Sequence, residues 1–348
     1  MSLAIAPHAA TPLSPPSCGL PVTTSHDIAS GDACRGTLAC TLALRHAGAR
    51  EVQLRYEFLG AAGLPVVLVA GGISAGRHVA ASAAFPQPGW WDAQCGTGRV
   101  LDPAHRRILT IDWLGGDGLL DAPIDPLDQA GAIAVLLDAL GIDALAAFVG
   151  CSYGAMVGLQ FAARHPARLA RLVAISGTHR AHPHASACRA LQRRAVALGA
   201  LQCDERDGLA LARQLAILGY RTPEEFDARF GGARVLAGRV RTDAEDYLDH
   251  CAAKYVAGTS PTAFLRLSES IDLQALEPES IPVPVTVVAV AEDRLVPVED
   301  AYALVERLAA GGAPSQPRLR VLRSLYGHDA FLKETVAIAV ILREALRA

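Results

Sequence analysis

Apolar residues recur along the chain in short runs that are separated by glycine, proline and polar segments. Around residues 37–44 and 52–58, apolar and polar positions alternate with a period of two, which predicts antiparallel strands with one face in water. Continuous apolar runs are instead typical of strands that are buried on both faces. Such runs occupy residues 64–70, 107–112, 145–149 and 172–176, and the strand pattern returns at residues 283–290 and 319–322.

Segments with apolar residues at helical spacing alternate with several of these strands. They cover residues 125–140, 155–165 and 334–347, and the first two end at Gly141 and before Pro166. Because strands and helices alternate, we predict an α/β fold with a mostly parallel, doubly wound sheet.

The pattern changes between residues 179 and 275, where Arg, Glu, Asp and Ala dominate and no long β-branched run occurs. We predict that this segment is a helical cap, or lid, inserted into an α/β core. Residues 36–178 form the first part of that core and residues 276–348 the second. Residues 1–35 start with a stretch rich in Ala, Pro and Ser and have no positive region before an apolar run, so we predict a mobile N-terminal tail rather than a secretion signal.

The composition mainly excludes classes of function. The 348 residues are 51% hydrophobic and 19% charged, and the formal net charge is -3. The sequence contains no basic stripe of the kind that nucleic-acid binding requires. The apolar runs are too short to span a membrane. The eight cysteines are scattered without a C-x-x-C pair, which indicates free thiols rather than a disulfide framework or a zinc site. We expect a cytoplasmic protein with no structural metal.

Residues 150–154 read Gly-Cys-Ser-Tyr-Gly and match the G-x-S-x-G pattern of a nucleophile, with a predicted buried strand before them and a predicted helix after them. A tight turn in this place lifts the hydroxyl of Ser152 above the sheet, at a helix N-terminus that favours developing negative charge. The alternative is an ordinary strand-to-helix turn in which Ser152 only caps the helix.

A serine hydroxyl needs a base to take its proton, and the partners in this fold follow in the order acid, then histidine. Asp293 comes directly after a predicted strand, with Glu292 as a rival. His328 is the only histidine beyond it. The sequence therefore predicts a catalytic triad of Ser152, Asp293 and His328. For the oxyanion hole we expect the backbone N–H of Tyr153 and, from the glycine-rich loop 71–75, that of Ile73.

Several segments resemble the homoserine O-acyltransferase family of the α/β-hydrolase superfamily, which includes homoserine O-acetyltransferases and their succinyl-transferring relatives. Residues 89–92 (Gly-Trp-Trp-Asp) resemble the family's G-W-W segment and residues 114–116 its L-G-G turn. Residues 208–213 resemble the cap segment with the family's substrate-binding arginine, here Arg213. Residues 327–332 (Gly-His-Asp-Ala-Phe-Leu) match most closely, and they bring His328 and a substrate-binding acid, Asp329.

The resemblance implies an α/β-hydrolase fold and ping-pong acyl transfer in methionine biosynthesis. Ser152 would take an acyl group from acyl-CoA, and the hydroxyl of L-homoserine would then collect it. Arg213 would hold the amino acid's carboxylate and Asp329 its ammonium group. The family also implies a homodimer and no cofactor beyond acyl-CoA as co-substrate.

The chain departs from the family pattern around the oxyanion loop and the nucleophile. Residues 71–75 (Gly-Gly-Ile-Ser-Ala) stand where the family usually has H-A-L-T-G. Leu295 fits the acetyl-type pattern, whereas Arg77 or Arg294 could supply a cation for a succinyl carboxylate. The sequence leaves open whether the donor is acetyl or succinyl, and whether the acceptor is homoserine, serine or another hydroxyl compound. The same fold would also accommodate an esterase or lactonase, or a catalytically inactive binding protein.

Overall fold

A nine-stranded sheet forms the centre of the molecule in the computed structural model, which describes residues 23–27, 33–202, 204–312 and 316–347. Its strands are β1 (Thr23–Asp27), β2 (Ala33–Leu44), β3 (Gly48–Leu59), β4 (Val66–Ala70), β5 (Arg107–Ile111), β6 (Ala147–Cys151), β7 (Leu172–Ile175), β10 (Val285–Val290) and β11 (Arg318–Leu322). They lie in the order β1-β2-β3-β5-β4-β6-β7-β10-β11.

Pairing in the sheet is parallel from β5 to β11, and the four strands β1, β2, β3 and β5 pair antiparallel. The antiparallel part contains the two segments whose polar and apolar positions alternate. Strands β4, β5, β6, β7 and β10 of the parallel part are largely buried, because helices cover both of its faces. Strand β11, at the edge of the sheet, is exposed or half-buried along its length. The predicted mostly parallel, doubly wound sheet is confirmed.

The core helices are α1 (Pro126–Ala139), α2 (Tyr153–Arg164), α8 (Val298–Ala310), α9 (Ala330–Lys333) and α10 (Thr335–Arg347). One buried cluster joins Ile133 of α1, Phe161 of α2 and Leu304 of α8, whereas a second cluster contains Leu342 of α10 and Trp91. The two clusters therefore fill the two faces of the sheet.

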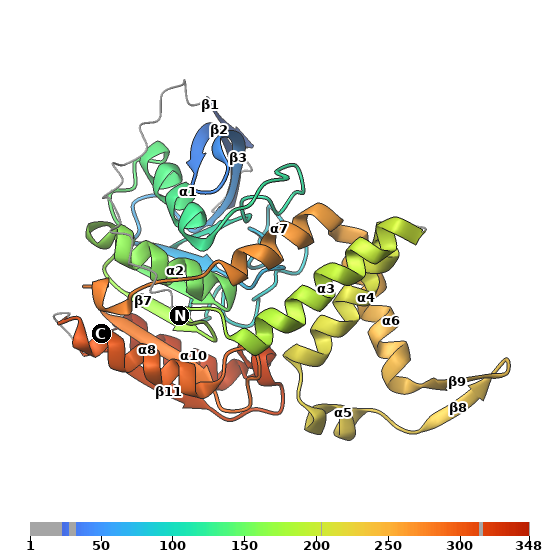
Figure 1. Ribbon diagram of the computed structural model, residues 1–348. Coiled ribbons are helices and arrows are strands. Elements are labelled where there is room, and N and C mark those ends of the chain that lie inside the picture. Colours follow the sequence, from blue (N-terminus) through green and yellow to red (C-terminus); the bar gives the residue numbers. More distant parts are fainter. Residues whose placement is uncertain (1–22, 28–32, 203, 313–315, 348) are drawn as a thin grey trace, which may run out of the picture.

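A mainly helical segment stands at one end of this core (Figure 1). It contains α3 (Pro183–Gln202), α4 (Glu205–Tyr220), α5 (Pro223–Arg229), α6 (Asp243–Gly258) and α7 (Pro261–Asp272). Helix α3 packs along α4, and α4 also contacts α6 and α7. These helices all fall within residues 179–275, where the sequence predicted the cap.

The predicted helical cap needs a correction in one place. Strands β8 (Ala233–Leu236) and β9 (Arg239–Thr242) form an antiparallel hairpin that projects from the other cap elements (Figure 1). Its two turn residues, Ala237 and Gly238, have φ values of 50° and 79°. Such turns favour Asn-Gly or Asp-Gly, so an Ala-Gly turn between two four-residue strands gives little indication in the sequence.

The predicted mobile tail of residues 1–35 needs a second correction. Strand β1 lies inside it, and β2 begins at Ala33. Because residues 23–27 read Thr-Thr-Ser-His-Asp, no apolar alternation marks this edge strand. Residues 1–22 and 28–32 lie outside the described residues, and for them the expectation stays a prediction.

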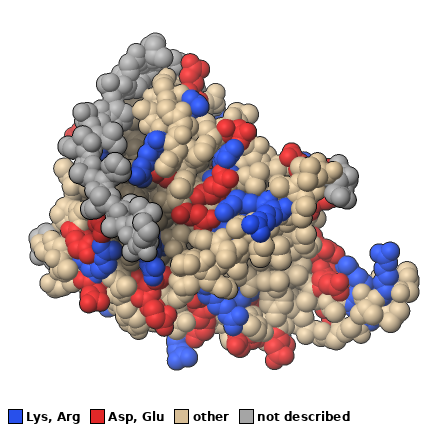
Figure 2. Space-filling view, viewed as in Figure 1, with Lys and Arg blue, Asp and Glu red and all other residues tan. Residues whose placement is uncertain are grey.

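The surface carries charges of both signs. On the face shown in Figure 2, Lys and Arg side chains lie interspersed with Asp and Glu, so this face shows no extended basic field. Among the described helices, none combines the length and the apolar character that crossing a membrane would demand.

Candidate active site

Ser152 occupies the turn between β6 and α2 in a strained backbone conformation, with φ 54° and ψ -114°. Two glycines permit this turn. A Cβ atom on Gly150 would overlap the carbonyl oxygen of Gly154, and a Cβ atom on Gly154 would overlap that of Ala70. Only glycine leaves room for such close backbone approaches. The turn places the Ser152 hydroxyl at the N-terminus of α2.

Ser152, His328 and Asp293 form one hydrogen-bonded line. Ser152 Oγ lies 2.7 Å from His328 Nε2, and His328 Nδ1 lies 2.7 Å from Asp293 Oδ2. His328 belongs to a short 3-10 turn, Gly327–Asp329, that follows β11, and Asp293 follows β10. The carboxyl ends of the parallel strands thus bring together three residues that are distant in the sequence.

Asp293, and not its neighbour Glu292, is the acid that reaches the histidine. Its second oxygen, Oδ1, accepts hydrogen bonds from the backbone N–H groups of Leu295 (2.8 Å) and Val296 (3.0 Å), which fix its orientation. Glu292 instead accepts a hydrogen bond from the backbone N–H of Ser324 at 2.8 Å. The two acids therefore have different partners.

The surroundings of His328 suit a general base that must carry a proton for a moment. Burial of the side chain lowers the pKa of His328, but the nearby Asp293 carboxylate raises it, and the net pKa lies above its ordinary value of 6.5. The carboxylate thus stabilises the imidazolium that would form when the Ser152 proton is transferred.

The two predicted oxyanion donors have no protein acceptor in the described part of the chain: neither the N–H of Ile73 nor that of Tyr153 is hydrogen-bonded there. The loop that carries Ile73 lies against the nucleophile, since a Cβ atom on Gly72 would come within 3.7 Å of the Ser152 Cβ. Trp113 Nε1 donates to the Gly72 carbonyl at 2.9 Å and holds the loop in place.

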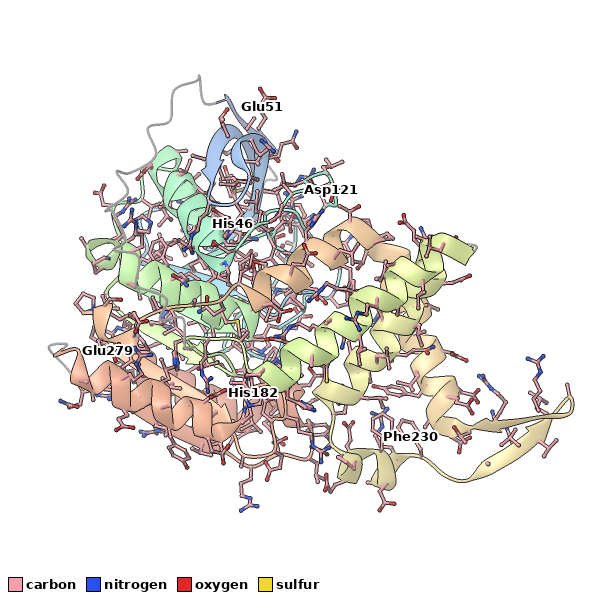
Figure 3. The ribbon with its side chains drawn as sticks, viewed as in Figure 1. His46, Glu51, Asp121, His182, Phe230 and Glu279 are labelled. Atoms are coloured by element: carbon pink, nitrogen blue, oxygen red, sulfur yellow. The ribbon has the colours of Figure 1, made fainter. Side chains whose placement is uncertain are left out.

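A cavity of about 330 Å³ opens over Ser152 and His328. Ile73 and Tyr153 line it from the core, and side chains of α3, α4, α6 and α7 close it from the cap. His182 also lines it, at the end of α3 that meets the core (Figure 3). The site therefore lies between core and cap.

The two predicted substrate-binding residues lie close to this cavity but do not line it. The guanidinium carbon of Arg213 is 5.4 Å from the ring centre of Tyr220 and 4.6 Å from that of Tyr255, two rings that do line it. Its buried Nε has no hydrogen-bond partner among the described residues. Asp329 Oδ2 forms an ion pair of 2.9 Å with Arg221 Nε.

The two arginines considered for a succinyl carboxylate are placed differently. Arg294 lines the cavity and is exposed. Arg77 is absent from the lining, and its Nε lies 3.8 Å from an oxygen of Asp112. Of these two arginines, the structure therefore places only Arg294 at the cavity.

Sequence reasoning did not find the supporting residues of the site. Arg221 became visible only through its ion pair with Asp329. Trp91 belongs to the G-W-W segment, but its role is seen only in the structure: its Nε1 donates to the carbonyl of Phe331 at 3.0 Å, in the segment directly after His328. The only indication in the sequence was the pair of adjacent tryptophans, Trp90 and Trp91, in a segment with no strand or helix pattern.

Residues 65–335 match a family model described as the alpha/beta hydrolase fold. With the Ser152–His328–Asp293 geometry, this places the chain in the class of α/β-hydrolase-fold enzymes. The chain is 61% identical to the homoserine O-succinyltransferase of Xanthomonas campestris pv. campestris, over 93% of this chain and 87% of that protein. It is 32% identical to the homoserine O-acetyltransferase of Thermus thermophilus, over 84% and 85%. The chain belongs to the homoserine O-acyltransferase family.

Solved structures agree on the fold. The homoserine O-acetyltransferase from Bacillus anthracis superposes with a TM-score of 0.82 at 17% identity, over 91% of this chain and 98% of that one. Esterase E22 gives a TM-score of 0.79 at 18% identity, over 90% of this chain and 100% of that one. Transferases and esterases therefore share this architecture.

Proposed function

We propose that the protein is an acyl-CoA:L-homoserine O-acyltransferase that works through an acyl-Ser152 intermediate, with succinyl as the acyl group. The observation that carries the proposal is the hydrogen-bonded line from Ser152 through His328 to Asp293, which faces a cavity between core and cap. The choice of substrates is supported by the relative at 61% identity, which is named a homoserine O-succinyltransferase.

In the first half-reaction His328 Nε2 accepts the Ser152 proton while Oγ attacks the thioester carbonyl carbon of acyl-CoA. The carbonyl oxygen becomes an oxyanion that the N–H groups of Ile73 and Tyr153 can stabilise. When the carbonyl re-forms, the C–S bond breaks and the CoA sulfur leaves as a thiol with the proton from His328. The products are free CoA and acyl-Ser152.

In the second half-reaction the same groups act in reverse. His328 takes the proton of the homoserine hydroxyl, whose oxygen attacks the acyl-Ser152 carbonyl, and Ser152 leaves with that proton. Arg213 would attract the amino acid's carboxylate, and its Nε, which has no hydrogen-bond partner among the described residues, is available to donate to it. Arg221 engages Oδ2 of Asp329, so Oδ1 is the oxygen offered to the ammonium group.

Several further properties belong to this proposal. The reaction needs no metal and no cofactor besides acyl-CoA as co-substrate, and its product enters methionine biosynthesis. We propose that the enzyme acts in the cytoplasm as a homodimer. Size-exclusion chromatography with light scattering tests the dimer directly.

Release of CoA thiol from succinyl-CoA and from acetyl-CoA, each with and without L-homoserine, tests the function. We expect release from succinyl-CoA that depends on homoserine and is lost in Ser152→Ala. Equal release without an acceptor would identify a hydrolase instead. L-serine belongs in the same assay, because relatives at 31% identity are named serine O-succinyltransferases, and faster release with serine than with homoserine would change the proposed acceptor.

A further inference from the structure

The charged side chains that line the cavity over Ser152 are positive. Arg180, Arg189 and Arg294 line it, and no aspartate or glutamate of the described chain does so. Positive charge that is not fully neutralised in a partly enclosed site attracts anions, because charges interact more strongly there than in bulk water. In the proposed reaction the acyl group reaches Ser152 through this cavity, so an acyl chain that ends in a carboxylate would meet these arginines.

Arg189 is held more rigidly than the other two. Its Nε donates to Asp272 Oδ1 at 2.8 Å, its Nη2 lies 2.6 Å from the same oxygen, and Nη2 also donates to Ser186 Oγ at 3.1 Å. Its side chain is only 11% exposed. A guanidinium carries five N–H donors, and Nη1 has no protein partner in the described residues. Two donors thus remain for a ligand.

The charge of Arg189 is only partly neutralised. Asp272 also pairs with Arg193, whose Nη1 lies 2.8 Å from Oδ2. Two guanidinium groups therefore share one carboxylate, and the cluster keeps an excess positive charge at the cavity wall. Removal of Arg189 would still leave Asp272 with Arg193 as its partner.

Arg180 and Arg294 are weaker candidates for binding the carboxylate of an acyl chain. Arg180 pairs with Asp300 at 2.6 Å, and half of its side chain is exposed. Arg294 is exposed to solvent, where screening weakens its attraction. Arg189 is also close enough to His328 to affect its pKa. Burial and the carboxylates of Asp293 and Asp329 have larger effects on this pKa, and the positive charge of Arg189 lowers it.

We propose that Arg189 binds the distal carboxylate of the succinyl group when succinyl-CoA reacts with Ser152. Arg189 thereby selects succinyl-CoA over acetyl-CoA as the acyl donor. The inference rests on the proposed acyl-CoA transferase function and names the residue that sets its donor preference. Arg189 makes no bond to the reacting thioester. It acts on specificity, through a charge-assisted hydrogen bond from Nη1 that acetyl cannot accept.

The test compares kcat/KM for succinyl-CoA and acetyl-CoA, with L-homoserine as acceptor, in wild type, Arg189→Gln, Arg189→Lys and Arg294→Gln. For Arg189→Gln we expect a fall of about 100-fold with succinyl-CoA, typical of truncating one partner of a buried charge pair, and little change with acetyl-CoA. Arg189→Lys restores part of the succinyl activity. Arg294→Gln keeps the wild-type donor ratio.

A second readout separates specificity from mere damage to the cap. Loss of the Arg189 charge raises the pKa of His328, so the acid limb of the kcat/KM profile with acetyl-CoA moves to higher pH in Arg189→Gln. The circular dichroism spectrum stays that of wild type, because Arg193 still pairs with Asp272.

Two results would overturn the inference while leaving the proposed function intact. The first is an unchanged ratio of kcat/KM between the two donors in Arg189→Gln, whether or not both activities fall. The second is a succinyl-specific loss in Arg294→Gln instead. If the wild-type enzyme releases CoA from neither donor when homoserine is added, the proposed function itself fails, and the inference fails with it.

Discussion

Arg221 joins the cap to the loop that carries the catalytic histidine: its Nε lies 2.9 Å from Oδ2 of Asp329, the residue after His328. The same guanidinium pairs with buried Glu225 through Nη1, at 2.9 Å. A second link runs parallel to the first, because the Thr222 hydroxyl donates to the carbonyl of Leu325. The cap therefore influences where both the base and the predicted ammonium-binding carboxylate lie.

Replacement of Arg221 by Gln removes this link. Among the residues that the structure describes, Asp329 loses its partner and Glu225 keeps only Arg229. We therefore expect the free energy of unfolding to fall by about 2 kcal/mol. Without the pair, Asp329 is free to move, and KM for homoserine should rise more than kcat falls. Urea unfolding and steady-state kinetics check both effects. An unchanged KM for the amino acid would show that the pair serves stability alone.

Asp293→Asn should remove most of the activity, because the amide no longer holds the histidine in its productive tautomer. Replacement of the acid in Ser–His–Asp triads lowers kcat by about 10,000-fold. Glu292→Gln is the matched control: Glu292 bonds to the backbone of Ser324 and not to His328, so kcat should stay near that of wild type. A larger loss in Glu292→Gln than in Asp293→Asn would reverse the assignment of the acid.

The pH dependence should reflect the raised pKa of His328. Burial lowers this pKa, the Asp293 carboxylate raises it, and the sum lies above the ordinary value of 6.5. Because the base must be neutral to accept a proton, kcat/KM should fall as the pH drops through a midpoint above 6.5. In Glu292→Gln the midpoint should stay where it is. A wild-type midpoint below 6.5 would contradict this account of the site.

Gly154→Ala should damage both fold and activity. The added methyl group would overlap the carbonyl oxygen of Ala70 and lie 2.7 Å from that of Gly71, two backbone atoms that cannot move aside cheaply. We expect a loss of more than about 3 kcal/mol in unfolding free energy, or no folded protein. Gly131→Ala is the control: it lies within α1 with no neighbour within 4 Å of the added atom, and should gain up to about 1 kcal/mol. Equal stabilities of the two variants would refute the steric argument.

The central strands and the nucleophile turn could be predicted because their causes are local. A continuous apolar run must be buried, and Gly150 and Gly154 mark the tight turn around Ser152. The order of acid and histidine along the chain then restricted the base to His328 and the acid to Asp293 or its neighbour Glu292. The structure decides for Asp293, which lies within hydrogen-bonding distance of His328.

The pairings within the cap could not be read in the same way. The cap is rich in Arg, Asp and Glu, and nothing in the sequence says that Arg221 pairs with Asp329 while Arg189 shares Asp272 with Arg193. Such pairs depend on how α3, α4 and α7 pack. The sequence analysis considered Arg77 and Arg294 for a succinyl carboxylate but not Arg189. That residue lies 104 residues before Asp293 in the sequence and outside every motif, so only the packing of α3 shows that it lines the cavity.

The most direct test of the central claim is to detect the acyl-enzyme itself. The protein is mixed with succinyl-CoA without an acceptor, its intact mass is measured, and the modified peptide is sequenced. We expect a mass increase of one succinyl group on the peptide with Ser152, its disappearance when L-homoserine is added, and no adduct in Ser152→Ala. Turnover without any adduct on Ser152, or an adduct that homoserine does not remove, would contradict acyl transfer through this serine.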